Sequence, residues 1–207
     1  NKTFKLDYNK NVVERNFELI KFALKLPYNK EEIHHKLAFL HSTQQHLTPS
    51  LSNIKKNIIL IPGASFSSKC YPVEKFAELT NLLDANYLIV WGSNEEKLLA
   101  DKIKKLAPHV NICEKLSIED LISLVSKTNL VIGPDTGPTH MGWASNIPSI
   151  TLFGPTPGYR NTFITENNKV IESKSEVNPY KINKNDHSIN EISAKEVAKM
   201  AQKLLHM

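Results

Sequence analysis

The sequence contains only two cysteines, Cys70 and Cys113, and their separation gives neither a CxxC pair nor the spacing of a zinc site. We therefore expect reduced thiols in a cytoplasmic protein. Four histidines stand in the first quarter of the chain, at positions 34, 35, 41 and 46. Their spacing fits no standard metal site, so we expect them to be solvated.

The glycine motifs of the common nucleotide-binding folds are also missing. The chain has seven glycines and no GxGxxG, which argues against a dehydrogenase. The segment 62–72 lacks the GxxxxGK spacing of an NTPase phosphate loop. No Ser-His-Asp, Cys-His or metal-ligand arrangement is found, so neither a metal nor a cofactor is expected.

Long hydrophobic runs are absent as well. No apolar stretch approaches the roughly 20 residues of a membrane span, and we expect no signal peptide before the fold. The composition, 41% hydrophobic and 23% charged, is typical of a soluble globular protein. A length of 207 residues suits one sizeable domain with an appendage, or two small domains. Because the first residue is Asn1, we expect an upstream part.

The basic excess is confined to the start of the chain. Residues 1–56 carry ten Lys or Arg against five Asp or Glu, a balance of +5. Residues 57–165 carry nine against ten, and residues 166–207 carry seven against six. A solvated lysine-rich surface is the favoured interpretation, and attraction to an anionic membrane surface is the alternative. Nucleic-acid binding is not expected, because no known motif or aromatic interleaving accompanies the charges.

From residue 57 onward, short apolar runs alternate with helical periodicity. We predict strands at 58–61, 87–91, 110–113, 130–132 and 149–153, and helices at 72–83, 94–106, 118–126, 135–144 and 194–205. This alternation predicts an α/β fold, a Rossmann-like parallel sheet with helices on both faces. Before it, an amphipathic helix is predicted at 12–26, then a short helix and a polar linker up to residue 56.

Ligands of such folds bind at the carboxyl ends of the strands, where three loops are informative. The loop at 62–72 offers the hydroxyl of Ser65 and the side chain of Lys69 just before a helix. Lys69 either neutralises a phosphate or is an ordinary surface lysine. In the loop at 91–96, Glu95 or Glu96 either binds a ribose diol or completes a capping box with the preceding serine.

The third loop, 133–140, carries the strongest signal. Asp135 and Thr136 stand where a helix N-cap is expected, Gly137 lets a ligand approach the backbone, and His140 follows one turn later. A helix that starts at a strand end is suited to a pyrophosphate. Asp135 is either a functional carboxylate or a cap, and this setting, beside a second Gly/Pro loop at 154–158, favours function. The residues alone thus indicate a domain that binds a nucleotide or a phosphosugar.

The segment 135–158, DTGPTHMGWASNIPSITLFGPTPG, resembles glycosyltransferase family 9, the heptosyltransferases of the lipopolysaccharide inner core. The family's Asp-Ser/Thr-Gly-x-x-His signature matches Asp135, Thr136, Gly137 and His140, and its GPT loop matches residues 154–156. Residues 69–72 are similar to its Lys-x-aromatic-Pro element, and 12–16 to the end of its first domain. Residues 91–96 resemble an element of heptosyltransferase I in particular.

This resemblance implies a two-domain GT-B enzyme on the cytoplasmic side of the inner membrane, without a cofactor. It would transfer L-glycero-D-manno-heptose, with inversion, from ADP-heptose to Kdo of Kdo2-lipid A. Residues 1–56 would be the end of the N-terminal domain and the interdomain linker, and 57–207 the donor-binding C-terminal domain. The implied contacts with the donor are Lys69, Thr136 and Gly137 for the pyrophosphate, Glu95 or Glu96 for the ribose, Asp135 for heptose hydroxyls, and His140 for phosphate or sugar.

One part of the family pattern has no counterpart. The family's general base, an aspartate, and its acceptor site lie in an N-terminal domain that residues 1–56 do not contain. The base therefore stays unidentified, and we expect the chain alone to bind the donor without transferring heptose. Two alternatives stay open: an enzyme like heptosyltransferase II, which uses a heptose acceptor, and a non-catalytic nucleotide-sugar-binding module.

Overall fold

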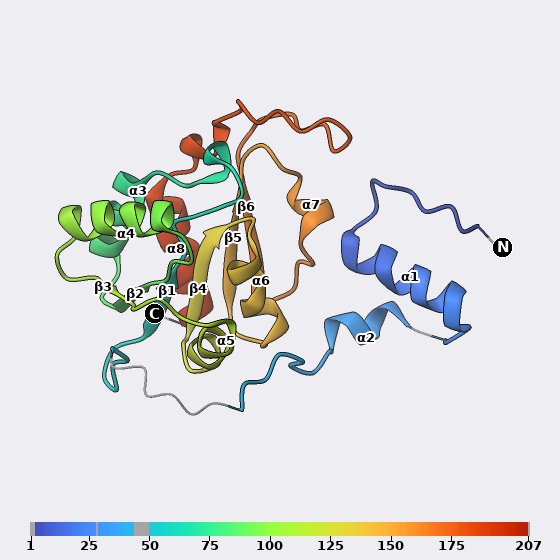
Figure 1. Cartoon of the computed structure of the whole chain (residues 1–207), viewed down its shortest axis with the longest axis horizontal. Coiled ribbons are helices and arrows are strands. Elements are labelled where there is room, and N and C mark those ends of the chain that lie inside the picture. The colour runs from blue at the N-terminus through green and yellow to red at the C-terminus, as the bar shows by residue number, and fades with distance from the viewer. Residues whose placement is uncertain (1–2, 28, 44–49, 207) are drawn as a thin grey trace.

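The computed structural model describes residues 3–27, 29–43 and 50–206, and a six-stranded parallel sheet forms its centre (Figure 1). The sheet order is β3-β2-β1-β4-β5-β6. The strands are β1 (Asn57–Leu60), β2 (Asn86–Ile89), β3 (Asn111–Ile112), β4 (Leu130–Pro134), β5 (Ser149–Phe153) and β6 (Asn168–Glu172). The order reverses between β1 and β4, which creates a crevice at the carboxyl ends of these two neighbours.

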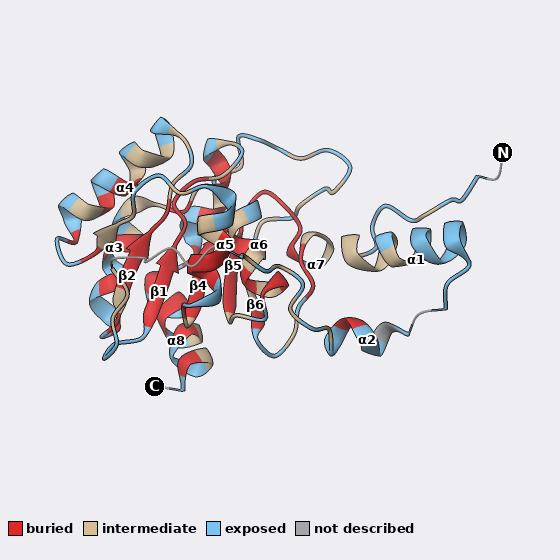
Figure 2. Ribbon diagram, turned by 60° about the horizontal axis from the view of Figure 1, so that its bottom comes forward, coloured by how far each residue is buried: buried red, intermediate tan, exposed pale blue. Residues whose placement is uncertain are grey.

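Helices cover both faces of the sheet, as predicted. In the body of the molecule they are α3 (Val73–Leu82), α4 (Asn94–Leu106), α5 (Ile118–Ser126), α6 (Gly137–Ala144), α7 (Gly158–Asn161) and α8 (Ala194–Leu205). Alternate residues of the central strands point to opposite faces. Ile58 and Leu60 pack with α3, α4 and α8, whereas Ile59 packs with α5. The strands are therefore buried on both sides, which Figure 2 shows as the red centre of the ribbon.

Local capping sets many of the helix boundaries. The predicted bounds 94–106, 118–126 and 194–205 are confirmed. The capping box at the start of α4 is confirmed too, since Ser93 Oγ accepts from Glu96 N–H at 3.2 Å and Glu96 Oε2 accepts from Ser93 N–H at 3.2 Å. At α8, Ser193 Oγ accepts from Glu196 N–H at 3.1 Å, the first half of such a box.

Several predicted bounds shift by one or two residues, and two elements of the body lie outside the prediction. The strand β6 and the short helix α7 were not predicted. The segment that forms β6, Asn-Lys-Val-Ile-Glu, has few apolar residues because it pairs with β5 alone, at the edge of the sheet. Its first residue, Asn168, is nevertheless buried, and its amide donates to the carbonyl of Phe163 at 2.7 Å.

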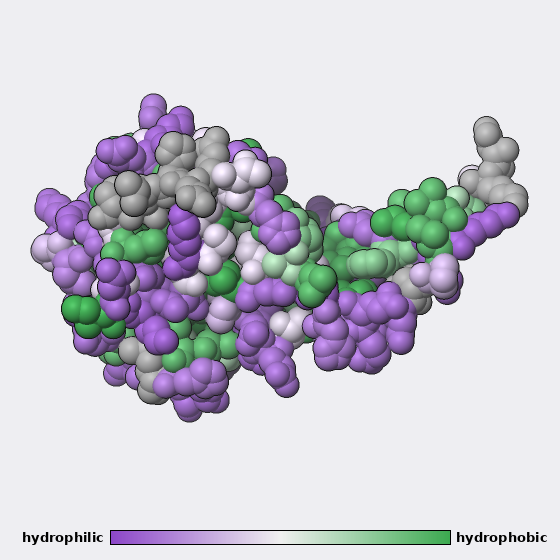
Figure 3. Space-filling view, turned by 90° about the horizontal axis from the view of Figure 1, so that it is seen from below, coloured by the Kyte–Doolittle hydropathy of each residue, from purple (hydrophilic) through white to green (hydrophobic). Residues whose placement is uncertain are grey.

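The N-terminal helices α1 (Val12–Leu24) and α2 (Lys30–His34) stand at one side of the sheet domain (Figure 1). α1 ends two residues before the prediction because Lys25 takes a left-handed conformation with φ of 55°. None of the residues of α1, all of them described, is buried. Its Leu24 is 64% exposed, and Figure 3 shows hydrophobic surface on the N-terminal part of the molecule that contains α1.

Two further expectations concern the first residues of the chain. His34, His35 and His41 are exposed, so solvation is confirmed for these three, and His46 lies outside the described residues. None of the helices in the described ranges has the length and apolarity needed to span a bilayer.

We expect Gly133→Ala to destabilise the fold by about 1–3 kcal/mol through overpacking. A Cβ at Gly133, in β4, would lie 2.6 Å from Thr139 Oγ1 and 2.7 Å from Ile61 Cβ. Gly137 provides the matched control, because a Cβ there meets no atom of the described chain within 4 Å. Urea unfolding of both variants measures the difference. Equal midpoints for Gly133→Ala and the wild type would contradict the packing described for β4 and α6.

Candidate functional site

The site lies where the loops after β1 and β4 meet. The first loop carries Lys69 at the end of a 3₁₀ turn (Ser67–Lys69), and the second carries Asp135 directly after β4. Because β1 and β4 are hydrogen-bonded neighbours, the two loops leave the sheet side by side. Lys69 Nζ lies 2.9 Å from Asp135 Oδ2, and both side chains are about nine-tenths buried, at 10% and 11% exposure.

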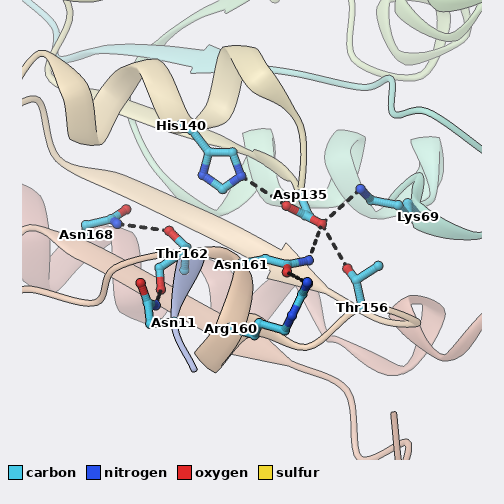
Figure 4. Close-up of polar contacts among 9 residues, drawn as sticks. All are labelled: Asn11, Lys69, Asp135, His140, Thr156, Arg160, Asn161, Thr162 and Asn168. Atoms are coloured by element: carbon cyan, nitrogen blue, oxygen red, sulfur yellow. Dashed lines mark hydrogen bonds and ion pairs between the residues drawn. The ribbon is translucent and has the colours of Figure 1, made fainter. Parts of the chain in front are cut away.

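Asp135 is the centre of a polar network (Figure 4). Besides Lys69, its Oδ2 accepts from Thr156 Oγ1 at 3.0 Å and from Asn161 Nδ2 at 3.1 Å. Its Oδ1 accepts from His140 Nε2 at 3.0 Å. Each carboxylate oxygen offers about two lone-pair positions, so Oδ2, with three donors, is fully occupied, whereas Oδ1 receives a hydrogen bond from His140 and keeps a second position.

These contacts fix the charge of Asp135. Burial alone would raise the pKa of this carboxyl group, because it disfavours the charged form. The hydrogen bond from His140 and the charge of Lys69 together outweigh burial and hold the pKa of Asp135 well below its usual range. The side chain is therefore an ionised carboxylate at neutral pH.

The structure excludes Asp135 as the cap of α6. The N-cap of α6 is Thr136, and no side chain caps this helix. The helix starts at Gly137 rather than at 135, so of the two residues expected at the N-cap, Thr136 is confirmed and Asp135 is wrong. The N–H of Gly137, the first residue of α6, has no acceptor within the helix, Pro138 has no N–H, and the N–H of Thr139 donates to the carbonyl of Thr136 at 3.1 Å. Gly137 is exposed and has open space around it, so an anion can approach the start of α6.

A cavity of about 410 Å³ lies beside this helix start, at the carboxyl ends of β1, β2 and β4. Its walls are mainly apolar, with a few hydroxyls and one carboxylate. They comprise Ile61, Val90, Trp91, Gly92, Ser93, Glu96, Leu116, Ser117, Ile118, Leu121, Thr136, Pro138 and Met141. The indole N–H of Trp91 donates to the carbonyl of Cys113 at 2.8 Å, which fixes the orientation of this ring.

The two candidate glutamates face different places. Glu96 lines the cavity, and its Oε2 also accepts from Gly92 N–H at 2.6 Å. The close approach of this side chain requires Gly63, where a Cβ would lie 2.3 Å from Glu96 Cγ. Glu95 is exposed and lines a neighbouring hollow with Gly63 and Cys70. Glu96 therefore both caps α4 and lines the cavity.

The structure thus brings most of the predicted residues to one crevice. Lys69, Asp135 and His140 are in contact, and Thr136 adjoins them and the cavity. Ser65 is exposed, and no hydrogen bond between described residues links it to the others. Asn161 was missed because the sequence gives no signal for the four-residue helix that carries it. Thr156 belonged to a recognised loop, but nothing local indicated its contact with Asp135.

Comparison with known proteins places this geometry among the glycosyltransferases. The sequence profile of glycosyltransferase family 9 (heptosyltransferase) matches residues 1–189. The chain is 33% identical over 99% of its length to lipopolysaccharide heptosyltransferase 1 of Campylobacter coli, and it spans 64% of that relative. It is 28% identical over 72% of its length to the Escherichia coli K12 enzyme of the same name, covering 46% of it.

Solved structures support the fold assignment. The E. coli heptosyltransferase WaaC with ADP superposes with a TM-score of 0.73 at 18% identity, covering 99% of this chain and 60% of that one. A family 9 glycosyltransferase from Veillonella parvula gives a TM-score of 0.78, also at 18% identity, covering 100% and 63%. The signature around Asp135, the parallel sheet and the profile match over 1–189 agree, and the chain belongs to glycosyltransferase family 9.

Proposed function

We propose that this chain is the donor-binding part of a lipopolysaccharide heptosyltransferase that uses ADP-heptose. The main support for this proposal is that a site for a pyrophosphate and a cavity for a nucleoside lie next to each other. An uncapped helix start with Lys69 opposite it suits a pyrophosphate, and the largely apolar 410 Å³ cavity beside it suits a nucleoside. The names of the similar proteins and the ADP bound to one structural neighbour support this proposal.

In this proposal the adenosine occupies the cavity. Apolar side chains of α5 and α6, among them Leu121 and Met141, contact the base, and the fixed ring of Trp91 closes one end. Glu96 Oε1 accepts from a ribose hydroxyl while Oε2 keeps its capping role. Glu95 is not assigned this role, because it lies outside the lining of the cavity.

The pyrophosphate lies against Lys69 and the N–H groups of Thr136 and Gly137. These donors stabilise the charge that develops on ADP as it leaves, and they need no reorganisation at that moment. When Lys69 turns to the phosphate, Thr156 and Asn161 still occupy the two lone pairs of Asp135 Oδ2, and Oδ1, which receives a hydrogen bond from His140, keeps a second lone pair for the ligand. A heptose hydroxyl then donates to Asp135, and His140 contacts the phosphate or the sugar.

The remaining parts of the proposal concern the acceptor. The family resemblance favours an inverting transfer of L-glycero-D-manno-heptose to Kdo of Kdo2-lipid A, at the cytoplasmic face of the inner membrane. The name of the Campylobacter coli relative, lipopolysaccharide heptosyltransferase 1, agrees with the resemblance to heptosyltransferase I, which implies Kdo as the acceptor. The general base would come from an N-terminal domain, and residues 1–56 would form the end of that domain and the linker. The exposed apolar side chains of α1 support this division.

Calorimetry with the 207-residue chain tests the donor assignment. ADP and ADP-heptose are expected to bind more tightly than NAD, because the site holds one pyrophosphate next to one nucleoside cavity. The variant Gly137→Ala should retain the stability of the wild type but bind ADP about tenfold more weakly, since its new methyl group fills the open space where the phosphate approaches. A preference for NAD, or no adenine nucleotide bound at millimolar concentration, would overturn the assignment.

A further inference from the structure

We infer that Asn161 is a positioning residue that holds Asp135 ready for the sugar, and that Arg160 orients its amide. This inference rests on the proposed donor site. Asn161 closes α7 and donates through Nδ2 to Asp135 Oδ2 at 3.1 Å (Figure 4). On its other side, Arg160 Nη1 donates to Asn161 Oδ1 at 2.8 Å.

The chemistry of the two neighbours permits only one orientation of this amide. An ionised carboxylate only accepts hydrogen bonds, and a guanidinium only donates them. The NH₂ group must therefore face Asp135, and the carbonyl oxygen must face Arg160. A flipped amide would set two acceptors against each other and two donors against each other, so both bonds would be lost.

α7 is anchored at both ends, so Asn161 has a fixed base. At its start, Gly158 N–H donates to Glu172 Oε1 of β6 at 2.7 Å. At its end, Asn11 Nδ2 donates to the carbonyl of Thr162 at 2.6 Å. In its middle, Arg160 Nε donates to the carbonyl of Tyr8 at 2.9 Å. The segment before α1 thus helps to hold the helix that faces the site.

The need for Asn161 follows from what happens to Lys69. When the pyrophosphate takes over Lys69, Asp135 Oδ2 loses its cationic partner and keeps the donors Thr156 and Asn161. The amide of Asn161 cannot turn to the phosphate without breaking its bond to Arg160. It therefore keeps the carboxylate in place while the second lone pair of Oδ1 accepts from a heptose hydroxyl.

The experiment measures the ratio of the ADP and ADP-heptose dissociation constants, which isolates the contribution of the sugar. The wild-type chain, Asn161→Ala, Asp135→Ala and the double variant form a cycle, with the exposed Asn167→Ala as the matched control. Asn161→Asp is added as a second variant, since it keeps the volume and the contact with Arg160 but sets a carboxylate against Asp135.

Asn161→Ala and Asn161→Asp are expected to lower the preference for ADP-heptose about tenfold while the affinity for ADP stays within about twofold. In the Asp135→Ala background, Asn161→Ala should have no further effect, because it acts through that carboxylate. Equal losses for ADP and ADP-heptose, or a loss that persists without Asp135, would overturn this inference and leave the donor site standing. A wild-type chain that binds neither ligand would instead refute the proposed function, and this inference with it.

Discussion

Asp135→Asn is expected to bind ADP more tightly than the wild type and yet to transfer heptose far more slowly. The substitution removes a negative charge beside the proposed pyrophosphate position and releases Lys69, 2.9 Å away, from its ion pair. We expect the affinity for ADP to rise about tenfold, as one charge-assisted contact becomes available to the ligand. The transfer rate should fall about a hundredfold, because the heptose is no longer held in its reactive orientation.

Calorimetry with ADP measures the first effect, and kcat/KM of an enzyme that also contains the N-terminal domain measures the second.

The pH dependence of the stability of the same variant gives an independent check. Because the pKa of Asp135 is lowered by folding, its carboxylate stabilises the fold at a pH above the unfolded value of about 3.9. That contribution is lost as the pH falls from there towards the folded pKa. The Asn variant should thus be less stable than the wild type at pH 7, and the gap in Tm should narrow below about pH 4. A variant with reduced stability and normal turnover would make Asp135 a purely structural residue.

Lys69→Met is expected to weaken ADP binding by about tenfold to a hundredfold while leaving adenosine binding unchanged. The loss is that of a buried, charge-assisted hydrogen bond to a phosphate, and methionine keeps most of the apolar stem of this buried side chain. Adenosine lacks the pyrophosphate and occupies only the cavity, whose walls do not include Lys69. Titration of both ligands into the same protein makes the comparison.

The matched control for this change is Lys102→Met, which removes the same charge from an exposed position on α4. Its affinity for ADP should equal that of the wild type at moderate salt, since distant exposed charges are screened. Equal weakening of adenosine and ADP by Lys69→Met would mean that the cavity itself had been damaged, and Lys69 would lose its phosphate role.

The sequence by itself determined the architecture of the domain. The bounds of α4, α5 and α8 were predictable because capping residues act within one turn, as at Ser93 and Ser117. The strand β5 was predictable because a parallel strand buried on both faces is continuously apolar. The signature at 135–140 was recognisable for the same reason, since its residues are neighbours in the chain.

The tertiary structure alone decided which side chains donate to Asp135. Its donors come from four segments, and Lys69 and Asn161 reach it only because β1, β4 and β5 lie next to one another in the sheet. The order of strands depends on packing between distant elements, which no local pattern records. The place of Glu96 in the lining of the cavity is also tertiary, although its role in the capping box follows from its spacing from Ser93. Gly63, which follows β1, leaves room for the side chain of Glu96, because a Cβ at this position would collide with it.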